Sequence, residues 1–336
     1  MSEASPTREP PKSILLATDL SPRCDRALDR AVLLSQSWQA KLVILHVLEK
    51  LQDADVDPTV PSWRRPHDPV SVAAKQLLAD IGPLAKTADI VIDEGDPAEA
   101  IVRTAEKKGC DLIITGVARD EPFGRLFLGT TVDRLLRSSH TPILIVKKRG
   151  QRTYSRIGAA IDFSDSSRHA LEAAVRCFPD QTLMIFHAYE MPMSGLAHDS
   201  AAYRRQCQQA VEQDYKAFLA TVECGETIRQ HARSFIEFGT PDEVLRRGVR
   251  DMDIDLVVLG TEGRGALSEM LIGSVGKHLM AELPCDVLMI REPPPDPLFA
   301  AAGSGQVGSA GPTWMIRFRG PPSMGSTRAR AHRKRC

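Results

Sequence analysis

The feature that most constrains this chain is that its sequence repeats itself. Residues 13–28 (SILLATDLSPRCDRAL) and residues 156–171 (RIGAAIDFSDSSRHAL) share one plan, in which an apolar run leads into Asp-x-Ser and then into a helical pattern. The match continues in two further pairs of segments, residues 95–116 with 239–260 and residues 128–148 with 272–292. Self-similarity of this kind indicates two copies of one structural unit.

The length of the chain agrees with two copies, because 336 residues are enough for about two domains. We expect domain 1 over residues 11–149 and domain 2 over residues 153–292, joined by a short basic and polar linker. Residues 1–10 form an N-terminal tail, and residues 293–336 form a C-terminal tail.

Each copy alternates short β-branched runs with helical periodicity, which is typical of a parallel sheet with crossover helices. We therefore predict an α/β fold made of two repeated, doubly wound, five-stranded parallel-sheet domains. Such sheets bind ligands beyond the carboxyl ends of the strands, where the winding reverses. In the second copy the expected strands cover residues 156–161, 181–187, 228–237, 255–260 and 285–290.

Several helices have recognisable signals. Apolar residues recur every three or four positions from Tyr203 to Val222, which predicts one face of a long helix. Asp96 and Thr240 each precede a proline and stand three residues before a glutamate, the arrangement of an N-cap with a capping box. A further helix is expected over residues 275–281.

The charges of the chain balance, with 43 Lys+Arg against 43 Asp+Glu, but their distribution is uneven. The C-terminal tail has a net charge of +6, so the rest of the chain has −6. A neutral whole attracts neither nucleic acid nor an anionic membrane over long range. The tail lacks periodicity and its composition predicts disorder. It is either a solvated extension or an arm for nucleic acid or an acidic partner, and we expect no other nucleic-acid contact.

No apolar run approaches the roughly 20 residues of a membrane-spanning helix, and the N-terminus has no apolar signal core. We therefore expect a cytoplasmic protein without membrane contact. The seven cysteines include no C-x-x-C pair, and most fall in apolar helical or strand-like segments. This pattern favours buried free thiols over a metal site.

The strongest functional signal is a glycine-spaced loop after the fourth strand of the second copy. Gly260 and Gly263 follow the apolar strand, and Gly273 with Ser274 comes nine residues later, before a helix. Glycines let the backbone approach an anion, and a helix N-terminus favours phosphate. Arg264 adds positive charge. Each half alone is also typical of an ordinary turn or helix start, but together, at the switch point, they favour phosphate binding.

This loop, with an Asp after the first strand, resembles the nucleotide-binding loop of the universal stress protein family. The likeness covers both copies, so the chain resembles a tandem universal stress protein with a Rossmann-like, nucleotide-binding α-hydrolase-like fold. The resemblance implies a site for ATP or AMP, with Mg as an optional counter-ion of the nucleotide. It implies that Asp162 contacts the ribose and that Ala160 and Ala188 line the adenine pocket. The implied phosphate-binding residues are Leu259, Gly260, Gly263, Gly273, Ser274 and Val275.

The loop of the first copy departs from this pattern at one position. Gly116 and the pair Gly129-Thr130 are present, but Arg119 stands where the second copy has Gly263. A side chain there disfavours positive φ and adds bulk where backbone should touch phosphate. Arg119 either fills the pocket or holds a phosphate in an altered pose through its guanidinium. We expect the first site, which includes Asp19, to be weaker or lost, and about one nucleotide per chain.

Other conspicuous residues have structural explanations. His46 and His187 occupy matching positions at the ends of the second strands, and without a Cys or His at metal spacing we expect hydrogen-bonded structural histidines. The Asp-x-Ser sequences at residues 19–21 and 162–164 are typical of helix caps. The G-x-x-x-x-G-K-[ST] loop of P-loop hydrolases is missing from the sequence. We therefore expect no catalytic residues and at most slow ATP hydrolysis.

The last strand of each copy, residues 143–146 and 287–290, is apolar, and the family resemblance implies that such strands pair between subunits. In a tandem chain we expect them to pair with each other in an intrachain pseudo-dimer, which covers sheet edges that invite aggregation. Further self-association into a homo-oligomer is left open. The proline-rich residues 57–70 are expected to form a loop over the sheet edge of the first copy.

The function that the resemblance implies is a stress response through nucleotide-dependent interactions with a protein partner, mainly by the second copy. One alternative is a nucleotide-free adaptor or chaperone-like protein whose loops are vestigial. Another is a weak ATPase. Co-purification of a nucleotide distinguishes the first two, and product formation tests the third.

Overall fold

The two repeats follow one another along the chain in this computed structural model, which describes residues 9–21, 24–48, 69–82, 87–119, 126–127, 129–190, 201–261 and 274–291. The first repeat contains β1 (Ser13–Thr18), α1 (Asp25–Trp38), β2 (Lys41–Leu48), α2 (Pro69–Ile81), β3 (Asp89–Glu94), α3 (Pro97–Lys108), β4 (Leu112–Gly116), β5 (Ala118–Arg119), β6 (Leu126–Phe127), α4 (Thr130–Ser138) and β7 (Ile143–Val146). The second contains β8 (Arg156–Ala160), α5 (Asp165–Cys177), β9 (Thr182–Tyr189), α6 (Ala201–Thr221), α7 (Gly225–His231), β10 (Arg233–Phe238), α8 (Pro241–Asp251), β11 (Leu256–Gly260), α9 (Ser274–Glu282) and β12 (Asp286–Ile290).

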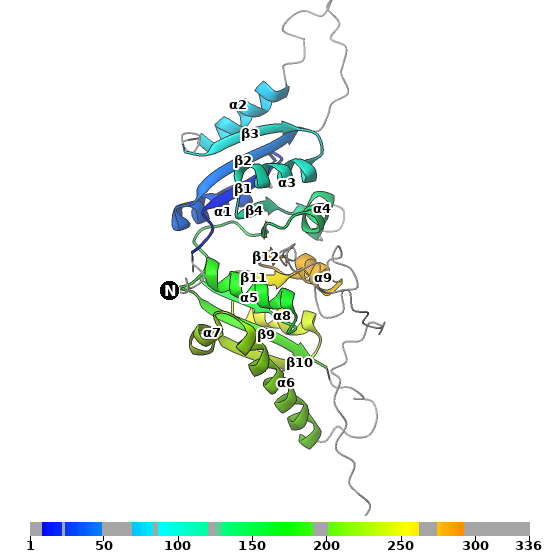
Figure 1. The fold of residues 1–336 in the computed structure, drawn as a ribbon. Helices are drawn as coiled ribbons and strands as arrows, with labels where there is room; N and C mark the ends of the chain where they lie inside the picture. Colours follow the sequence, from blue (N-terminus) through cyan, green and yellow to red (C-terminus); the bar gives the residue numbers. More distant parts are fainter. Residues whose placement is uncertain are drawn as a thin grey trace, which may run out of the picture.

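Within the described residues, ten strands form one continuous sheet in the order β10-β9-β8-β11-β12-β7-β4-β1-β2-β3. The sheet runs through the whole length of the molecule (Figure 1). Inside each repeat every pairing of this ten-stranded sheet is parallel, and the winding reverses beside the first strand, between β1 and β4 and between β8 and β11. The predicted α/β class, with two doubly wound parallel sheets, is confirmed.

Helices cover both faces of the sheet, and each face has a core that extends through both repeats. Apolar residues of α1, α2, α5 and α7 pack on one face, and those of α3, α4, α8 and α9 pack on the other. Neighbouring strand residues alternate between the cores, so Ile14 and Leu16 lie in the first core and Leu15 in the second. Burial on both faces explains why the central strands are continuous apolar runs rather than alternating ones.

The two repeats meet where the last strands of each pair antiparallel. Leu288 of β12 lies opposite Leu144 of β7, and the neighbouring residues follow in register. The expected pairing of the last strands within one chain is therefore confirmed. It relates the repeats by an approximate two-fold axis between β7 and β12 and removes two edges that would otherwise be open to other chains.

A buried carboxylate stabilises the junction between β7 and β12. Asp286 is fully buried, and its Oδ1 accepts hydrogen bonds from the backbone N–H groups of Lys147 (2.8 Å) and Lys148 (2.9 Å). Its Oδ2 accepts from the hydroxyl of Tyr154 at 2.6 Å and lies 3.4 Å from Nε of Arg30. The Arg30 guanidinium in turn lies 3.9 Å from the centre of the Tyr154 ring. A buried charge needs such partners, and here they come from α1, the linker and the end of β7.

The helix starts test the predicted caps. The Asp96 and Thr240 side chains accept from the backbone N–H groups of the third helical residues, at 3.0 and 3.4 Å, so both N-caps are confirmed. Ser164 caps α5 in the same way. The cap expected at residues 19–21 is wrong, because α1 begins only at Asp25, after Cys24, whose side chain makes no capping bond.

Two other expectations differ from the structure. The strand predicted over residues 228–237 is wrong in its first part, since residues 225–231 form α7 and β10 begins at Arg233. Ile228 of α7 is buried in the core below the sheet, which favours a helical turn there. The short hairpin of β5 and β6 was not expected. Of the proline-rich segment only residues 69–70 lie within the described residues, where they begin α2, and the C-terminal tail lies outside them.

Candidate functional site

The switch point of the second repeat lies at the carboxyl ends of β8 and β11. These strands are neighbours, with Val258 paired to Ala159, so the residues that follow them come out at the same edge of the sheet. Asp162 follows β8, and Gly260 ends β11. Ala160 and Ala188 stand near the ends of the adjacent strands β8 and β9, and both are half-buried. The structure therefore brings these predicted site residues to one edge.

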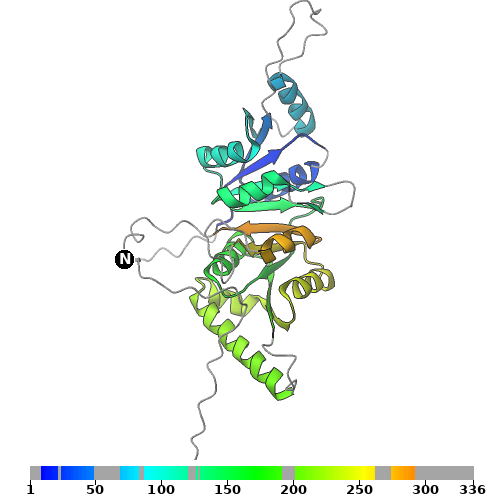
Figure 2. The same cartoon turned by 90° about the vertical axis from the view of Figure 1, so that its right-hand side faces the viewer.

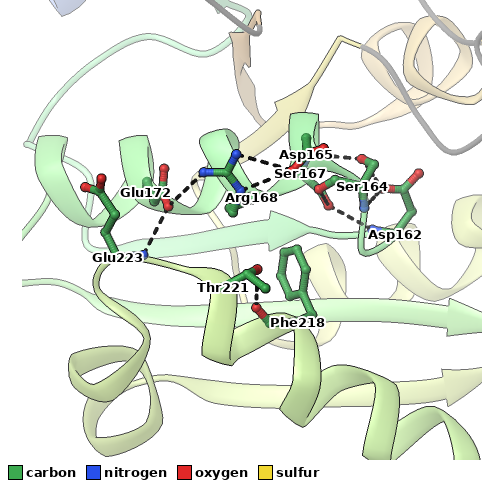
Figure 3. A network of polar contacts seen from close by, with 9 residues as sticks. All are labelled: Asp162, Ser164, Asp165, Ser167, Arg168, Glu172, Phe218, Thr221 and Glu223. Carbon is green, nitrogen blue, oxygen red and sulfur yellow. Dashed lines mark hydrogen bonds and ion pairs between the residues drawn. The ribbon is translucent and has the colours of Figure 1, made fainter. Parts of the chain in front are cut away.

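The turn after β8 holds Asp162 firmly. Its Oδ1 accepts hydrogen bonds from the backbone N–H of Ser164 (3.1 Å) and from the Ser164 hydroxyl (2.5 Å), and Ser164 Oγ accepts from the N–H of Ser167 at the start of α5 (Figure 3). Between them Phe163 has φ of 64°, the left-handed region that bulky residues rarely adopt. Leu20, at the matching position of the first repeat, has φ of 59°. Such strain is typical of functional turns.

A row of polar contacts continues along α5 from this turn (Figure 3). Arg168 lies 3.2 Å from a carboxylate oxygen of Asp165 and 3.5 Å from one of Glu172. Glu172 also accepts a hydrogen bond from the backbone N–H of Glu223, which follows α6. These contacts engage Arg168 with its own helix, and they fasten α5 to the segment that follows α6.

The matching histidines brace the ends of the first strands. The Nδ1–H of His187 donates to the carbonyl of Ile161 at 2.9 Å, and His46 donates in the same way to Thr18. The His187 ring also stacks on Phe163, with centroids 4.0 Å apart. Both side chains are buried. The prediction of hydrogen-bonded structural histidines is confirmed, and the two rings hold the strand ends that lead into Asp19 and Asp162.

Gly260 has a packing role that the motif alone does not reveal. A Cβ at this position would lie 2.4 Å from the hydroxyl of Ser166 and 2.8 Å from its backbone carbonyl. The first turn of α5 thus rests directly on the end of β11, and only glycine leaves room for it. This contact brings the start of α5 and the start of the glycine loop together.

Thr261, the residue after Gly260, is a site candidate that the sequence reasoning missed. It is buried, its backbone N–H donates to the carbonyl of Ile290 at 3.0 Å, and its hydroxyl has no hydrogen-bond partner in the described part of the chain. A buried hydroxyl without a partner costs stability. Thr261 stands at the carboxyl end of β11, where the glycine loop leaves the sheet. In the sequence GTEG, Thr261 lies between the two glycines of the motif and gives no signal of its own, so only its burial could identify it as a site candidate.

The remaining loop residues lie mostly outside the described residues. Gly263, Arg264 and Gly273 belong to residues 262–273, which the structure does not describe. Helix α9 begins at Ser274, and Val275 follows it. The predicted helix start directly after Gly273 is therefore confirmed. Leu259 is buried at the end of β11.

In the first repeat the matching carboxylate is engaged by a thiol. Asp19 accepts from the backbone N–H of Ser21 at 2.9 Å. Burial raises its pKa, but hydrogen bonds from the Cys24 thiol and from Ser21 outweigh this effect and lower it. Burial and the same contact with Asp19 raise the pKa of Cys24 to about 11, so this thiol stays protonated near neutral pH and donates to the carboxylate.

The loop of the first repeat is also built differently from a glycine turn. Arg119 lies in β5 and pairs with Leu126 of β6 in an antiparallel hairpin. Gly116 ends β4, and Gly129 is the N-cap of α4, whose first residue is Thr130. Residues of β6 lie beside α9 of the second repeat. This loop thus contacts the helix on which the glycine loop of the other repeat ends.

The described residues offer no group of three or more His, Cys, Asp or Glu side chains that could hold a metal ion. The six cysteines among them are free thiols, four of them buried, as expected. Burial raises the pKa of Cys177 to about 11 and that of Cys285 to about 12. None of the helices that the structure describes combines the length and the apolar character needed to cross a membrane.

Comparison with known proteins gives a consistent result. The model of the universal stress protein family matches the chain twice, over residues 11–147 and 153–291. A universal stress protein of Methanocaldococcus jannaschii is 28% identical over 141 residues, 41% of this chain and 82% of that protein. The universal stress protein E homolog of Haemophilus influenzae is 24% identical over 217 residues, 60% of this chain and 68% of that protein.

Two solved structures share the fold over most of the chain. A universal stress protein from Archaeoglobus fulgidus has a TM-score of 0.58 at 21% identity and covers 83% of this chain and 98% of its own. A protein of unknown function from Pseudomonas aeruginosa PAO1 has a TM-score of 0.57 at 23% identity, with 84% and 92% covered. At these identities the likeness concerns the fold alone.

Proposed function

The chain belongs to the universal stress protein family, and we propose that it binds an adenine nucleotide, ATP or AMP, mainly in its second repeat. The observation that carries this proposal is the edge of the sheet where the Asp162 turn and the buried Thr261 hydroxyl follow neighbouring strands, the hydroxyl having no hydrogen-bond partner among the described residues. Through the bound nucleotide the protein would act in a stress response by changing its interactions with a protein partner.

The proposed roles follow from the chemistry of each group. The Asp162 carboxylate accepts hydrogen bonds from the ribose hydroxyls, and the chain near Ala160 and Ala188 leaves room for the adenine. The phosphates lie over the glycine loop and the N-terminus of α9, whose unpaired N–H groups and dipole favour negative charge. Thr261 donates to a nucleotide oxygen, and Arg264 adds charge. Mg would accompany ATP as a counter-ion of its phosphates.

The second repeat is proposed as the main site because the first departs from the glycine pattern of the loop. Arg119 of the first repeat stands in a paired strand in place of Gly263, and its side chain adds bulk where the backbone of the loop should approach phosphate. The residues Asp19, Gly116, Arg119, Gly129 and Thr130 would form at most a weaker site.

Calorimetric titration of the purified, nucleotide-free chain with ATP tests the proposal. About one site per chain is expected, and Gly263→Arg, which copies the first repeat into the second, should abolish binding without lowering the melting temperature. Mass spectrometry of any ligand that co-purifies identifies the physiological nucleotide. Two equivalent sites would refute the asymmetry, whereas no binding would favour the nucleotide-free adaptor. Formation of ADP or AMP during overnight incubation would favour a weak ATPase.

The two Asp-x-Ser turns provide a matched pair of variants. Asp162→Ala should weaken ATP binding by about 10- to 100-fold, the effect of losing hydrogen bonds to a charged group. Asp19→Ala removes a similar turn hydrogen bond from the first repeat and should leave the affinity unchanged. Both variants lose the backbone N–H contact of the turn, and Asp162→Ala also loses the bond from the Ser164 hydroxyl. Similar melting temperatures would therefore show that the difference in affinity arises from the ligand. Equal affinities of the two variants would refute the assigned site.

A further inference from the structure

Helix α9 of the second repeat is held by residues of the first repeat. It is the helix that begins at Ser274, directly after the glycine loop. Three parts of the first repeat reach it: Lys147 after β7, Asp133 of α4, and strand β6. Figure 2 shows α4 and α9 next to each other across the middle of the molecule.

Lys147 supplies donors at the C-terminal end of α9. Its side chain is buried, and its ammonium group donates to the carbonyl of Leu283 at 2.7 Å and to the carbonyl of Met280. The carbonyl of Met280 would ordinarily accept from the residue four positions on, but that residue is Pro284, which has no N–H. A cation at a helix C-terminus also complements the helix dipole.

The position of Lys147 is itself fixed from the second repeat. Its backbone N–H donates to the buried carboxylate of Asp286, which begins β12. The side chain therefore starts from an anchored backbone and reaches its two carbonyls without solvent in between. Burial lowers the pKa of Lys147 to about 8, and neutral or charged, the amine keeps the two N–H donors that these contacts need.

The approximate two-fold axis repeats this contact in the other direction. Arg291 follows β12 as Lys147 follows β7, and its guanidinium donates at 2.6 Å to the carbonyl of Arg137 in the last turn of α4. Between the two helices, Asp133 of α4 forms an ion pair with Lys277 of α9 at 2.8 Å. Asp133 and Lys277 occupy the same position in the two repeats, so two identical repeats could not form this pair.

We propose that the first repeat anchors helix α9 and thereby raises the nucleotide affinity of the second repeat, with Lys147 as the positioning residue. This inference rests on the proposed function, because phosphate binding at the N-terminus of α9 is part of that proposal. A helix of nine residues is only about 14 Å long. A shift at its C-terminal end therefore moves the N–H groups at its N-terminal end, where small displacements weaken an anion contact.

The test compares Lys147→Met with its two-fold counterpart Arg291→Met in the full-length chain. Hydrogen exchange should become faster in residues 274–282 for Lys147→Met and in residues 130–138 for Arg291→Met. Calorimetry with ATP should give an affinity about 3- to 30-fold weaker for Lys147→Met, the range of coupling between packed elements, and an unchanged affinity for Arg291→Met. Equal affinities of Lys147→Met and wild type, with α9 exchanging faster, would overturn the proposal.

Other outcomes are also decisive. If the wild-type chain does not bind ATP, the proposed function is refuted. The anchoring of α9 by the first repeat is then tested separately, by whether hydrogen exchange in α9 becomes faster in Lys147→Met. If Lys147→Met does not fold, Asp133→Asn decides. Asp133 is half-exposed, so this position tolerates asparagine, which is neutral and isosteric. Loss of its ion pair with Lys277 should weaken ATP binding by about two- to threefold, within the range that a partly exposed ion pair contributes. No change in either α9 exchange or ATP affinity would refute the anchor.

Discussion

At the scale of single residues, several positions of the candidate site have structural roles that do not depend on a ligand. Gly260 is required because the first turn of α5 presses on it, with Ser166 in the place that a Cβ would take. Asp162 and Ser164 form a turn that also caps α5. The proposed nucleotide contacts therefore build on residues that the fold already needs, and a substitution at this edge affects stability as well as binding.

Gly260→Ala should lower the free energy of unfolding by about 1–3 kcal/mol, the cost of overpacking, because the added methyl meets backbone atoms of Ser166. Gly158→Ala in β8 is the control, since its Cβ would meet only side-chain atoms of Ile254 and Phe186, at 3.2 Å or more. Denaturant unfolding of both variants without nucleotide measures the difference. A Gly260→Ala chain as stable as Gly158→Ala would contradict the packing role.

At the scale of the elements, some helix ends are stabilised by residues next to them in sequence and others by distant parts of the chain. The starts of α3 and α8 are capped by Asp96 and Thr240, residues directly ahead of them in sequence. The end of α9 instead receives its donors from Lys147, more than a hundred positions earlier in the chain. A helix whose own sequence ends in proline depends in this way on another element.

The buried Lys147 should make stability depend on pH. Its pKa is about 8 in the folded chain and near 10.5 when unfolded, so between these values the unfolded chain binds more protons and stability rises with pH. The free energy of unfolding of wild type relative to Lys147→Met should therefore increase by about 2 kcal/mol from pH 7 to pH 9.5. Denaturant unfolding at both pH values measures it, and a relative stability independent of pH would contradict a buried ammonium.

At the scale of the whole molecule, the two repeats share one sheet and both of its cores. The sheet is continuous through β7 and β12, and both cores contain residues of both repeats. The Asp286 carboxylate adds polar contacts to the linker and to α1. We therefore expect the two repeats to unfold together in a single transition.

Asp286→Ala should cost about 3–5 kcal/mol, because it leaves the buried Arg30 without its carboxylate. The weakened junction should then give two unfolding transitions in scanning calorimetry, one for each repeat. Asp29→Ala is the control, since it removes only an exposed ion pair with Arg149, worth at most about 1 kcal/mol, and should keep the single transition. Two transitions already in the wild-type chain would contradict the cooperative unit.

Much of the fold was predictable because its signals are local. Apolar runs, prolines and caps predicted the strands of the second repeat and several helices, and internal similarity predicted that the two repeats share one plan. The segment at residues 228–237 was misread because Ile228 is apolar in either structure, and only its burial under the sheet selects helix α7. The β5–β6 hairpin was missed because its strands have two residues each, too few for a periodic signal.

The sequence by itself determined the repeated α/β plan and the difference between Arg119 and Gly263, because these depend on residue type and order. The pairing of the last strands followed from the family resemblance. Only the tertiary structure determined the burial of the Thr261 hydroxyl, the packing of Gly260 and the contacts of Lys147 and Asp286. Each of these depends on which atoms surround a buried group. Those atoms come from distant parts of the chain that only the closed sheet brings within hydrogen-bond or contact distance.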